Sequence, residues 1–94
     1  MNALLLVVDF HLEGCRSLKE KRQRLKGFSE RWGKVGQVAV CESDYQNALK
    51  QAQWSFVIAG SDWRHVQQIQ AKLEEDLSQS LDAVITSLHQ ERLL

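Results

Sequence analysis

The sequence predicts one α+β domain with two layers, built from four strands and two helices in the order β-α-β-β-α-β. Its 94 residues are 44% hydrophobic and 26% charged, as in an ordinary soluble globular domain. A chain of this length buries roughly 60–68% of its unfolded surface, which is enough for a two-layer core. Apolar residues alternate in four short stretches and follow helical spacing in two longer ones. We expect residues 1–94 to form this single domain.

The first strand is predicted over residues 4–12, because apolar residues occupy every second position there. One set should face the core: Leu4, Leu6, Val8, Phe10 and Leu12. The intervening residues should face away from it: Leu5, Val7, Asp9 and His11. This stretch lacks a basic segment at its start and a small-residue cleavage site, so we expect a strand rather than a signal peptide.

The first helix is predicted to begin at Ser17, because Ser17 and Glu20 have the spacing of a capping box. Its apolar residues fall on one stripe when the chain is wound as a helix: Leu18, Leu25, Phe28 and Trp32. Lys21 falls inside this stripe, where we expect its stem to pack and its amine to reach solvent past the helix end. Gly33 should end the helix.

The middle of the chain predicts two strands, over residues 35–41 and 54–59. Between them, Ala48, Leu49 and Ala52 have near-helical spacing, so we expect a short helical turn within residues 46–53. The second helix should be capped by Ser61, and its apolar stripe is Val66, Ile69, Leu73 and Leu77. A fourth strand is predicted over residues 83–88.

This element order is typical of the ferredoxin-like sandwich, with an antiparallel sheet in the order 4-1-3-2 and both helices on one face. The other face of the sheet should therefore be open. Leu5 and Val7 on this face would expose apolar surface in a central strand. One alternative for the function is therefore a homodimeric protein-interaction module that uses the open sheet face.

Basic and acidic residues are equal in number, twelve of each, but they are unevenly distributed. Residues 16–34 carry eight of the twelve basic residues and two of the acidic ones, so this segment is +6 and the remainder −6. On the helix, Lys19, Arg22 and Lys26 share one flank, while Arg24 and Arg31 lie on the other. Clustered cations next to a helix N-terminus favour a nucleic-acid interface. We expect the phosphate contacts to involve Arg16, Lys19, Lys21, Arg22 and Lys26, although a solvated helix face would have a similar composition.

The sequence offers little for catalysis, and we expect no enzyme activity. The topology separates His11 from His65 and His89, so the three histidines should not converge on a metal. Cys15 and Cys41 lack a CxxC partner, which predicts free thiols, and the glycines form no phosphate-binding loop. We therefore predict no cofactor and no metal. Without 18 consecutive apolar residues, we also expect no membrane span.

A polar segment follows the second strand, with Glu42, Asp44 and Gln46 at alternate positions. In the predicted topology it lies at the same end of the sheet as Arg16 and Ser17. Ion pairs that join the two loops are one interpretation, and a functional site is the other.

Residues 16–22, with the sequence R-S-L-K-E-K-R, resemble the signature of the YlxP-like family of small bacterial proteins of unknown function. Within it we single out Ser17, Leu18 and Glu20. Residues 38–42 with Asp44 and Gln46 resemble the second motif of the family, and residues 59–62 with His65 and Val66 resemble its strand-to-helix junction. Asn47 departs from the pattern, which usually has an aspartate there.

The resemblance covers nearly the whole chain. It implies a ferredoxin-like fold, a cytoplasmic bacterial protein, and genes that often lie among those for translation initiation and ribosome maturation. It implies no established reaction. We therefore expect a non-enzymatic accessory protein that binds ribosomal RNA or a ribosome-associated surface through its basic first helix.

Overall fold

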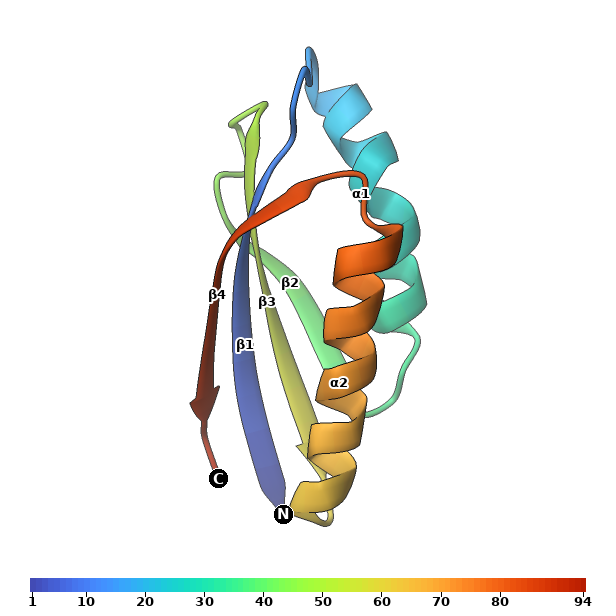
Figure 1. The fold of residues 1–94 in the computed structure, drawn as a ribbon, viewed down its shortest axis with the longest axis vertical. Coiled ribbons are helices and arrows are strands. Elements are labelled where there is room, and N and C mark those ends of the chain that lie inside the picture. The colour runs from blue at the N-terminus through green and yellow to red at the C-terminus, as the bar shows by residue number, and fades with distance from the viewer.

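The computed structural model describes residues 1–94 and contains six elements along the chain (Figure 1). They are β1 (Asn2–His11), α1 (Leu18–Gly33), β2 (Val38–Asp44), β3 (Gln51–Gly60), α2 (Trp63–Ser80) and β4 (Val84–Arg92). The predicted order β-α-β-β-α-β is confirmed. Both helices cover the same face of the sheet, and the two chain ends lie together at the end of the molecule opposite the β1–α1 loop.

The four strands form one antiparallel sheet in the order β2-β3-β1-β4, which is 4-1-3-2 when counted from the β4 edge. The central pair is in register along its whole length, from Asn2 opposite Gly60 to His11 opposite Gln51. The pairing shifts by a bulge between Asp9 and Phe10 on the β4 side, and another between Glu42 and Asp44 on the β3 side. Bulges strengthen local twist, and both lie toward the end of the sheet where α1 begins.

The core lies between the sheet and the helices and contains the residues that the alternation in β1 predicts. Leu6, Val8 and Leu12 are completely buried there. Strand β3 contributes Phe56 and Ile58 from the same face, and α2 contributes its stripe of Val66, Ile69, Leu73 and Leu77. Phe28 of α1 meets Phe56 edge to face, with 5.9 Å between the ring centroids.

Three local predictions were wrong. Residues 46–53 form no helical turn: residues 46–47 form a turn, residues 49–50 form a bend, and β3 already begins at Gln51. The second strand begins at Val38 rather than at residue 35, because Val38 donates its N–H to the Val35 carbonyl in a turn after α1. Helix α2 is capped by Asp62 and not by Ser61: the Asp62 side chain accepts the His65 N–H at 3.1 Å.

The fourth strand is also longer than predicted and runs to Arg92, because it pairs with β1 as far as Leu4. No helix in the structure is both long and apolar enough to cross a lipid bilayer.

Candidate functional site

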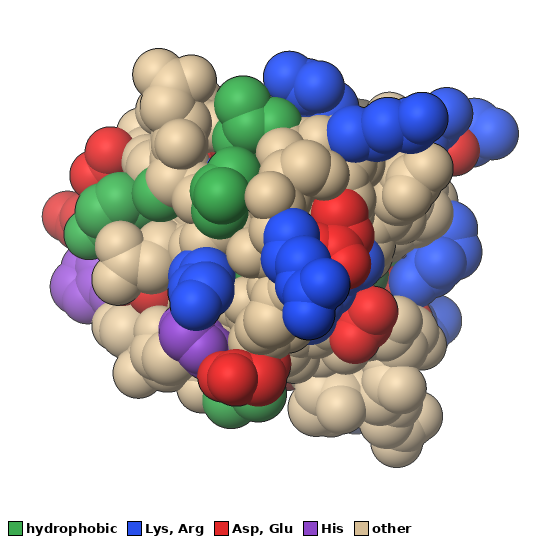
Figure 2. Space-filling model, turned by 90° about the horizontal axis from the view of Figure 1, so that it is seen from above, with side chains coloured by type: hydrophobic (Ala, Val, Ile, Leu, Met, Phe, Trp, Pro, Cys, Tyr) green, Lys and Arg blue, Asp and Glu red, His purple; other side chains and the backbone are tan.

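A groove of about 660 Å³ runs between α1 and the segment that joins β2 to β3. The helix side contributes Leu18, Lys19, Arg22 and Lys26. The opposite side contributes Glu42, Gln46, Asn47 and Trp54. We call this feature the groove. Figure 2 views the molecule from above, from the end that carries the β1–α1 loop in Figure 1. It shows Lys and Arg side chains gathered on the side where α1 lies.

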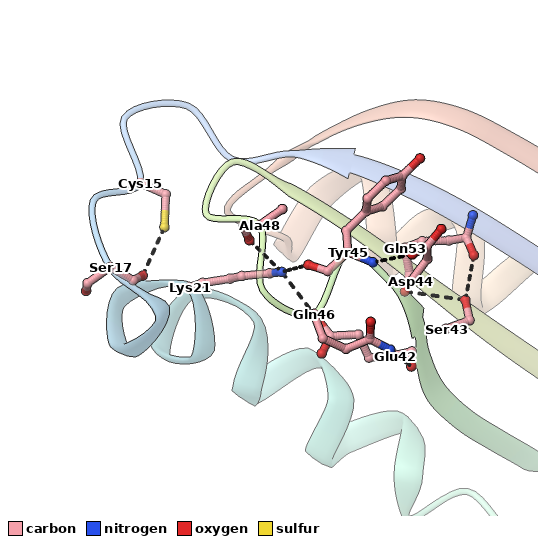
Figure 3. A network of polar contacts seen from close by, with 10 residues as sticks. All are labelled: Cys15, Ser17, Lys21, Glu42, Ser43, Asp44, Tyr45, Gln46, Ala48 and Gln53. Atoms are coloured by element: carbon pink, nitrogen blue, oxygen red, sulfur yellow. Dashed lines mark hydrogen bonds and ion pairs between the residues drawn. The ribbon is translucent and has the colours of Figure 1, made fainter.

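Lys21, which the sequence predicts to contact phosphate, lines the groove with a largely buried side chain and has a structural role. Its side chain is only 4% exposed. The amine does not reach solvent past the helix end: it donates to the Tyr45 carbonyl at 2.7 Å and to the Ala48 carbonyl at 2.9 Å (Figure 3). It also lies 3.5 Å from a carboxylate oxygen of Glu42. Lys21 therefore fixes the β2–β3 segment against α1, and its amine is already bonded within the protein.

The flank of α1 that faces the groove carries three exposed cations: Lys19, Arg22 and Lys26. We call these residues the groove flank. The side chains of Lys19 and Arg22 make no hydrogen bond or ion pair, and Lys26 has a loose ion pair with Glu30 at 3.8 Å, four residues along the same helix. Such exposed pairs contribute little to stability, so all three charges remain accessible to an anion.

The opposite flank of α1 carries Arg24 and Arg31, which we call the inner flank. Arg24 donates to the Glu13 carbonyl at 2.9 Å and lies 3.2 Å from a carboxylate oxygen of Asp82. Arg31 lies 3.0 Å from Asp76 on α2. Both arginines therefore hold α1 to neighbouring parts of the fold, and their charges are compensated within the molecule.

Asp76 lies near the C-terminus of α2, where the helix dipole disfavours a negative charge, and its contacts compensate for this position. Its carboxylate accepts the indole N–H of Trp32 at 2.7 Å as well as the Arg31 guanidinium. Burial raises the pKa of Asp76, but hydrogen bonds from Ser80, Trp32 and Arg31 outweigh it and hold that pKa below its ordinary value. The two helices are thus joined through this one carboxylate.

The predicted capping box at the start of α1 is present. The Ser17 hydroxyl accepts the Glu20 N–H at 3.0 Å, and the Glu20 carboxylate accepts the Arg16 N–H at 2.6 Å. This bond to the Arg16 N–H holds the pKa of Glu20 below its ordinary value. Because Glu20 already supplies negative charge at this helix terminus, the helix end itself offers less to a phosphate than the sequence suggested. The exposed Arg16 side chain is unpaired.

The two segments that resemble family motifs meet at the groove. Leu18 and Glu42 line it from opposite sides, and Lys21 connects them from beneath. Gln46 also lines the groove and donates its amide to the Glu42 carbonyl at 3.2 Å. Asp44 is different, because its carboxylate accepts the N–H of Tyr45 within its own loop. Tyr45 has a positive φ of 61°, which this contact helps to hold.

Five groove residues were not identified from the sequence as site candidates: Gln23, Leu25, Ser29, Asn47 and Trp54. Trp54 lies on the core side of β3, like Phe56, so alternation alone assigns it to the core. Asn47 was noticed only as a departure from a family pattern. The sequence signal that pointed to this place was the polar segment with Glu42 and Gln46, which was predicted to lie at the same end of the sheet as the start of the basic helix.

The open sheet face carries both apolar and polar residues. Leu5 lies opposite Val57, and both are half-buried. Further along β1, one carboxylate oxygen of Asp9 is buried without a hydrogen-bond partner. Ser43 donates to the Gln53 side chain at 2.9 Å (Figure 3) and accepts from the Ser55 hydroxyl at 2.8 Å, which links Ser55 and Gln53 through Ser43.

The three histidines lie in different parts of the fold and do not converge on one site. His11 contacts Glu13 at 2.9 Å, and this hydrogen bond and the charge of His11 hold the pKa of Glu13 below its ordinary value. His65 lies in the first turn of α2, and His89 lies on β4 opposite Val7. The structure holds no cluster of three or more His, Cys, Asp or Glu residues that could bind a metal. Cys15 is buried and donates to the Ser17 carbonyl, whereas Cys41 is exposed.

Solved structures with low sequence identity share this fold. The chain is similar to a structural-genomics protein, YJCS, with a TM-score of 0.66, 9% identity, and coverage of 98% of this chain and 99% of the other. It is also similar to a protein described as an antibiotic biosynthesis monooxygenase from Chloroflexus aurantiacus J-10-fl, with a TM-score of 0.55, 9% identity, and coverage of 98% and 93%.

A third similar structure is the de novo designed protein Ferredog-Diesel, with a TM-score of 0.52, 16% identity, and coverage of 95% and 83%. At these identities the likeness shows the ferredoxin-like fold alone. No curated protein matches the sequence. One family model matches residues 4–90, nearly the whole chain, and this chain therefore belongs to the family described as protein of unknown function, DUF503.

Proposed function

We propose that this protein is a non-enzymatic accessory protein of the cytoplasm that binds RNA through the groove flank of α1. The observation that carries the proposal is the contrast between the paired cations of the inner flank and the exposed cations of the groove flank. Lys19, Arg22 and Lys26 lie beside an open groove, and Arg16 extends the same positive surface at the start of the helix. Cations without internal partners are available to neutralise phosphates.

The resemblance to YlxP-like proteins favours ribosomal RNA or a ribonucleoprotein surface as the partner. Genes of that family often lie among those for translation initiation and ribosome maturation. Binding through phosphates would be salt-dependent and largely independent of sequence, since backbone contacts carry little sequence information. Such binding suits an accessory protein that attaches to a folded RNA.

A mobility-shift titration of structured RNA at two salt concentrations tests the proposal. We expect the wild type to lose affinity as salt rises, and a Lys19/Arg22/Lys26 triple alanine variant to bind more weakly. The slope of the logarithm of its affinity against the logarithm of salt concentration, the salt slope, should be smaller in magnitude by roughly 2–3, because each neutralised phosphate contributes about 0.7–0.9. An Arg64→Ala/Lys72→Ala variant, which removes two exposed cations from α2, is the control and should bind like the wild type. Equal binding by the wild type and the triple variant would contradict the proposal.

A second candidate function is homodimerisation through the open sheet face, which the half-buried pair of Leu5 and Val57 favours. A second copy covering this face would remove their remaining apolar surface from water. Light scattering of the wild type and of Leu5→Glu distinguishes the candidates. A dimer that Leu5→Glu dissociates supports this second function, and a monomer in both proteins removes it.

A further inference from the structure

We propose that the groove holds one unpaired nucleotide of a bound RNA strand, with its phosphate on the groove flank and its base between Trp54 and Asn47. This inference rests on the proposed RNA binding and specifies which form of RNA is bound. It follows from the shape of the groove, from the chemistry of its two sides, and from the unpaired polar groups on the side opposite α1.

The size of the groove is suited to a small ligand. Its volume of about 660 Å³ lies within the usual range of about 300–1,000 Å³ for small-molecule sites. A helix that contacts only the backbone of a duplex needs an exposed cationic surface and no such hollow. The groove is therefore an additional feature that phosphate contacts alone do not explain.

The positive charges in the groove lie on the side of α1. Lys19, Arg22 and Lys26 all come from α1, whereas the opposite side contributes one carboxylate, Glu42, and the uncharged Gln46 and Asn47. The buried amine of Lys21 lies 3.5 Å from Glu42 and compensates its charge. A ligand that fits this arrangement is anionic on one side and neutral and polar on the other, as a nucleotide is.

The neutral side has free hydrogen-bonding groups. The amide of Asn47 is exposed and makes no hydrogen bond, and Gln46 uses its amide nitrogen on the Glu42 carbonyl while its amide oxygen stays free. Side-chain amides of this kind both donate and accept, and so can bond to the edge of a base. In RNA these edges are accessible to proteins chiefly where bases are unpaired.

Trp54 supplies an aromatic surface in the groove. Its indole nitrogen is buried and has no acceptor, in contrast to that of Trp32, which is held by Asp76 at 2.7 Å. The Trp54 ring is held by packing against the core and not by a hydrogen bond, and the same residue lines the groove. Unpaired bases stack on aromatic side chains regardless of their identity, which agrees with binding that is largely independent of sequence.

Tryptophan fluorescence and affinity measured together test the inference. The probes are a short single-stranded RNA, the blunt duplex of the same sequence, and the four nucleoside monophosphates. We expect the single strand to quench the wild type and a Trp63→Phe variant, but to produce much less quenching in Trp54→Phe. Trp63 is the matched control, because it lies at the start of α2, where Arg92 stacks over its ring.

Asn47→Ala provides a variant that does not alter the core, because Asn47 is exposed. We expect it to weaken binding of the single strand severalfold and to leave binding of the duplex unchanged. Trp54→Ala should weaken binding of the single strand by about 5- to 150-fold, the range measured for loss of stacking on one base. Circular dichroism of each variant shows that the fold is retained before its affinity is compared.

Each outcome decides a different point. Tighter binding of the single strand, with quenching that depends on Trp54, supports the inference. Equal binding of single strand and duplex without a Trp54 signal overturns the inference but leaves RNA binding by the groove flank intact. If no RNA binds, the proposed function fails as well. Binding of a nucleoside monophosphate as tight as that of the strand would overturn the RNA strand as the source of the nucleotide.

Discussion

The two flanks of α1 carry similar charges and have different surroundings. Arg24 and Arg31 on the inner flank contact Asp82 and Asp76, which lie far away along the chain. The groove flank meets no comparable acid: its one ion pair joins Lys26 to Glu30 on the same helix. A run of basic residues in a sequence therefore contains both structural and accessible charges. The contacts made by each side chain, and not the density of charge, distinguish them.

Lys21 belongs to neither flank, and its loss should have the largest effect on stability. Lys21→Met removes the donor for two carbonyls and the partner of Glu42. We expect the free energy of unfolding to fall by about 2–3 kcal/mol, since each unsatisfied group costs about 1–3 kcal/mol. Urea unfolding measures the effect, and Lys19→Met, at an exposed position two residues away, is the control with an expected change within about 0.5 kcal/mol. Equal stability of the two variants would show that Lys21 does not hold the β2–β3 segment.

The loss of Asp76 should have the next largest effect on stability, because Asp76 compensates Arg31 of the inner flank. Asp76→Ala leaves the Trp32 indole and Arg31 without their acceptor, and we expect a loss of about 1–2 kcal/mol in thermal or urea unfolding. Glu75→Ala is the matched control: Glu75 is exposed on the same turn of α2, where removal of a negative charge should leave stability unchanged or slightly raised. If both variants lose the same stability, the link between the helices through Asp76 is wrong.

The contribution of Asp76 should also depend on pH in one direction. The pKa of Asp76 is lower in the folded protein than its ordinary value of 3.8. Such a group stabilises the fold fully above its pKa in the unfolded chain, and this stability is lost as the pH falls through the folded pKa. The stability difference between the wild type and Asp76→Ala should therefore be constant near neutral pH and shrink below about pH 4. A difference that grows on acidification would contradict this assignment.

The smallest effect is expected at the start of α1. Ser17→Ala removes the acceptor for the Glu20 N–H, and we expect a loss of about 1 kcal/mol in stability, as for other N-caps. RNA affinity should not change, because the accessible charges lie on the groove flank and not at the helix end. Weaker RNA binding by a folded Ser17→Ala protein would place phosphate at the helix N-terminus instead.

Much of the fold could be predicted from the sequence, because alternation and helical spacing are local properties. The core set from Leu4 to Leu12 and the stripe of α2 were identified in this way. The segment between β2 and β3 was misassigned because a distant side chain helps to decide its conformation. Lys21 donates to the carbonyls of Tyr45 and Ala48, and the local bond from the Ala48 N–H to the Tyr45 carbonyl closes only a single turn. No local pattern carries that information.

The candidate site could be predicted only in part. Helical periodicity separated Lys19, Arg22 and Lys26 from Arg24 and Arg31, and the structure keeps that division. The burial of Lys21 was missed because the interpretation assumed open solvent past the helix end, where the β2–β3 segment in fact lies. Trp54 was not identified as a groove residue, because strand alternation shows which face of the sheet a residue occupies but not whether a helix covers it.

The central claim is that the two flanks of α1 have different roles, and two matched double variants test it most directly. Arg22→Ala/Lys26→Ala and Arg24→Ala/Arg31→Ala each remove two positive charges from the same helix. We expect the first to weaken RNA binding and lower the salt slope by roughly 1.4–1.8 with little change in stability. The second should lower stability and leave RNA affinity nearly unchanged. If a titration of structured RNA under graded salt shows equal losses of affinity for both variants, only net charge matters and the account is wrong.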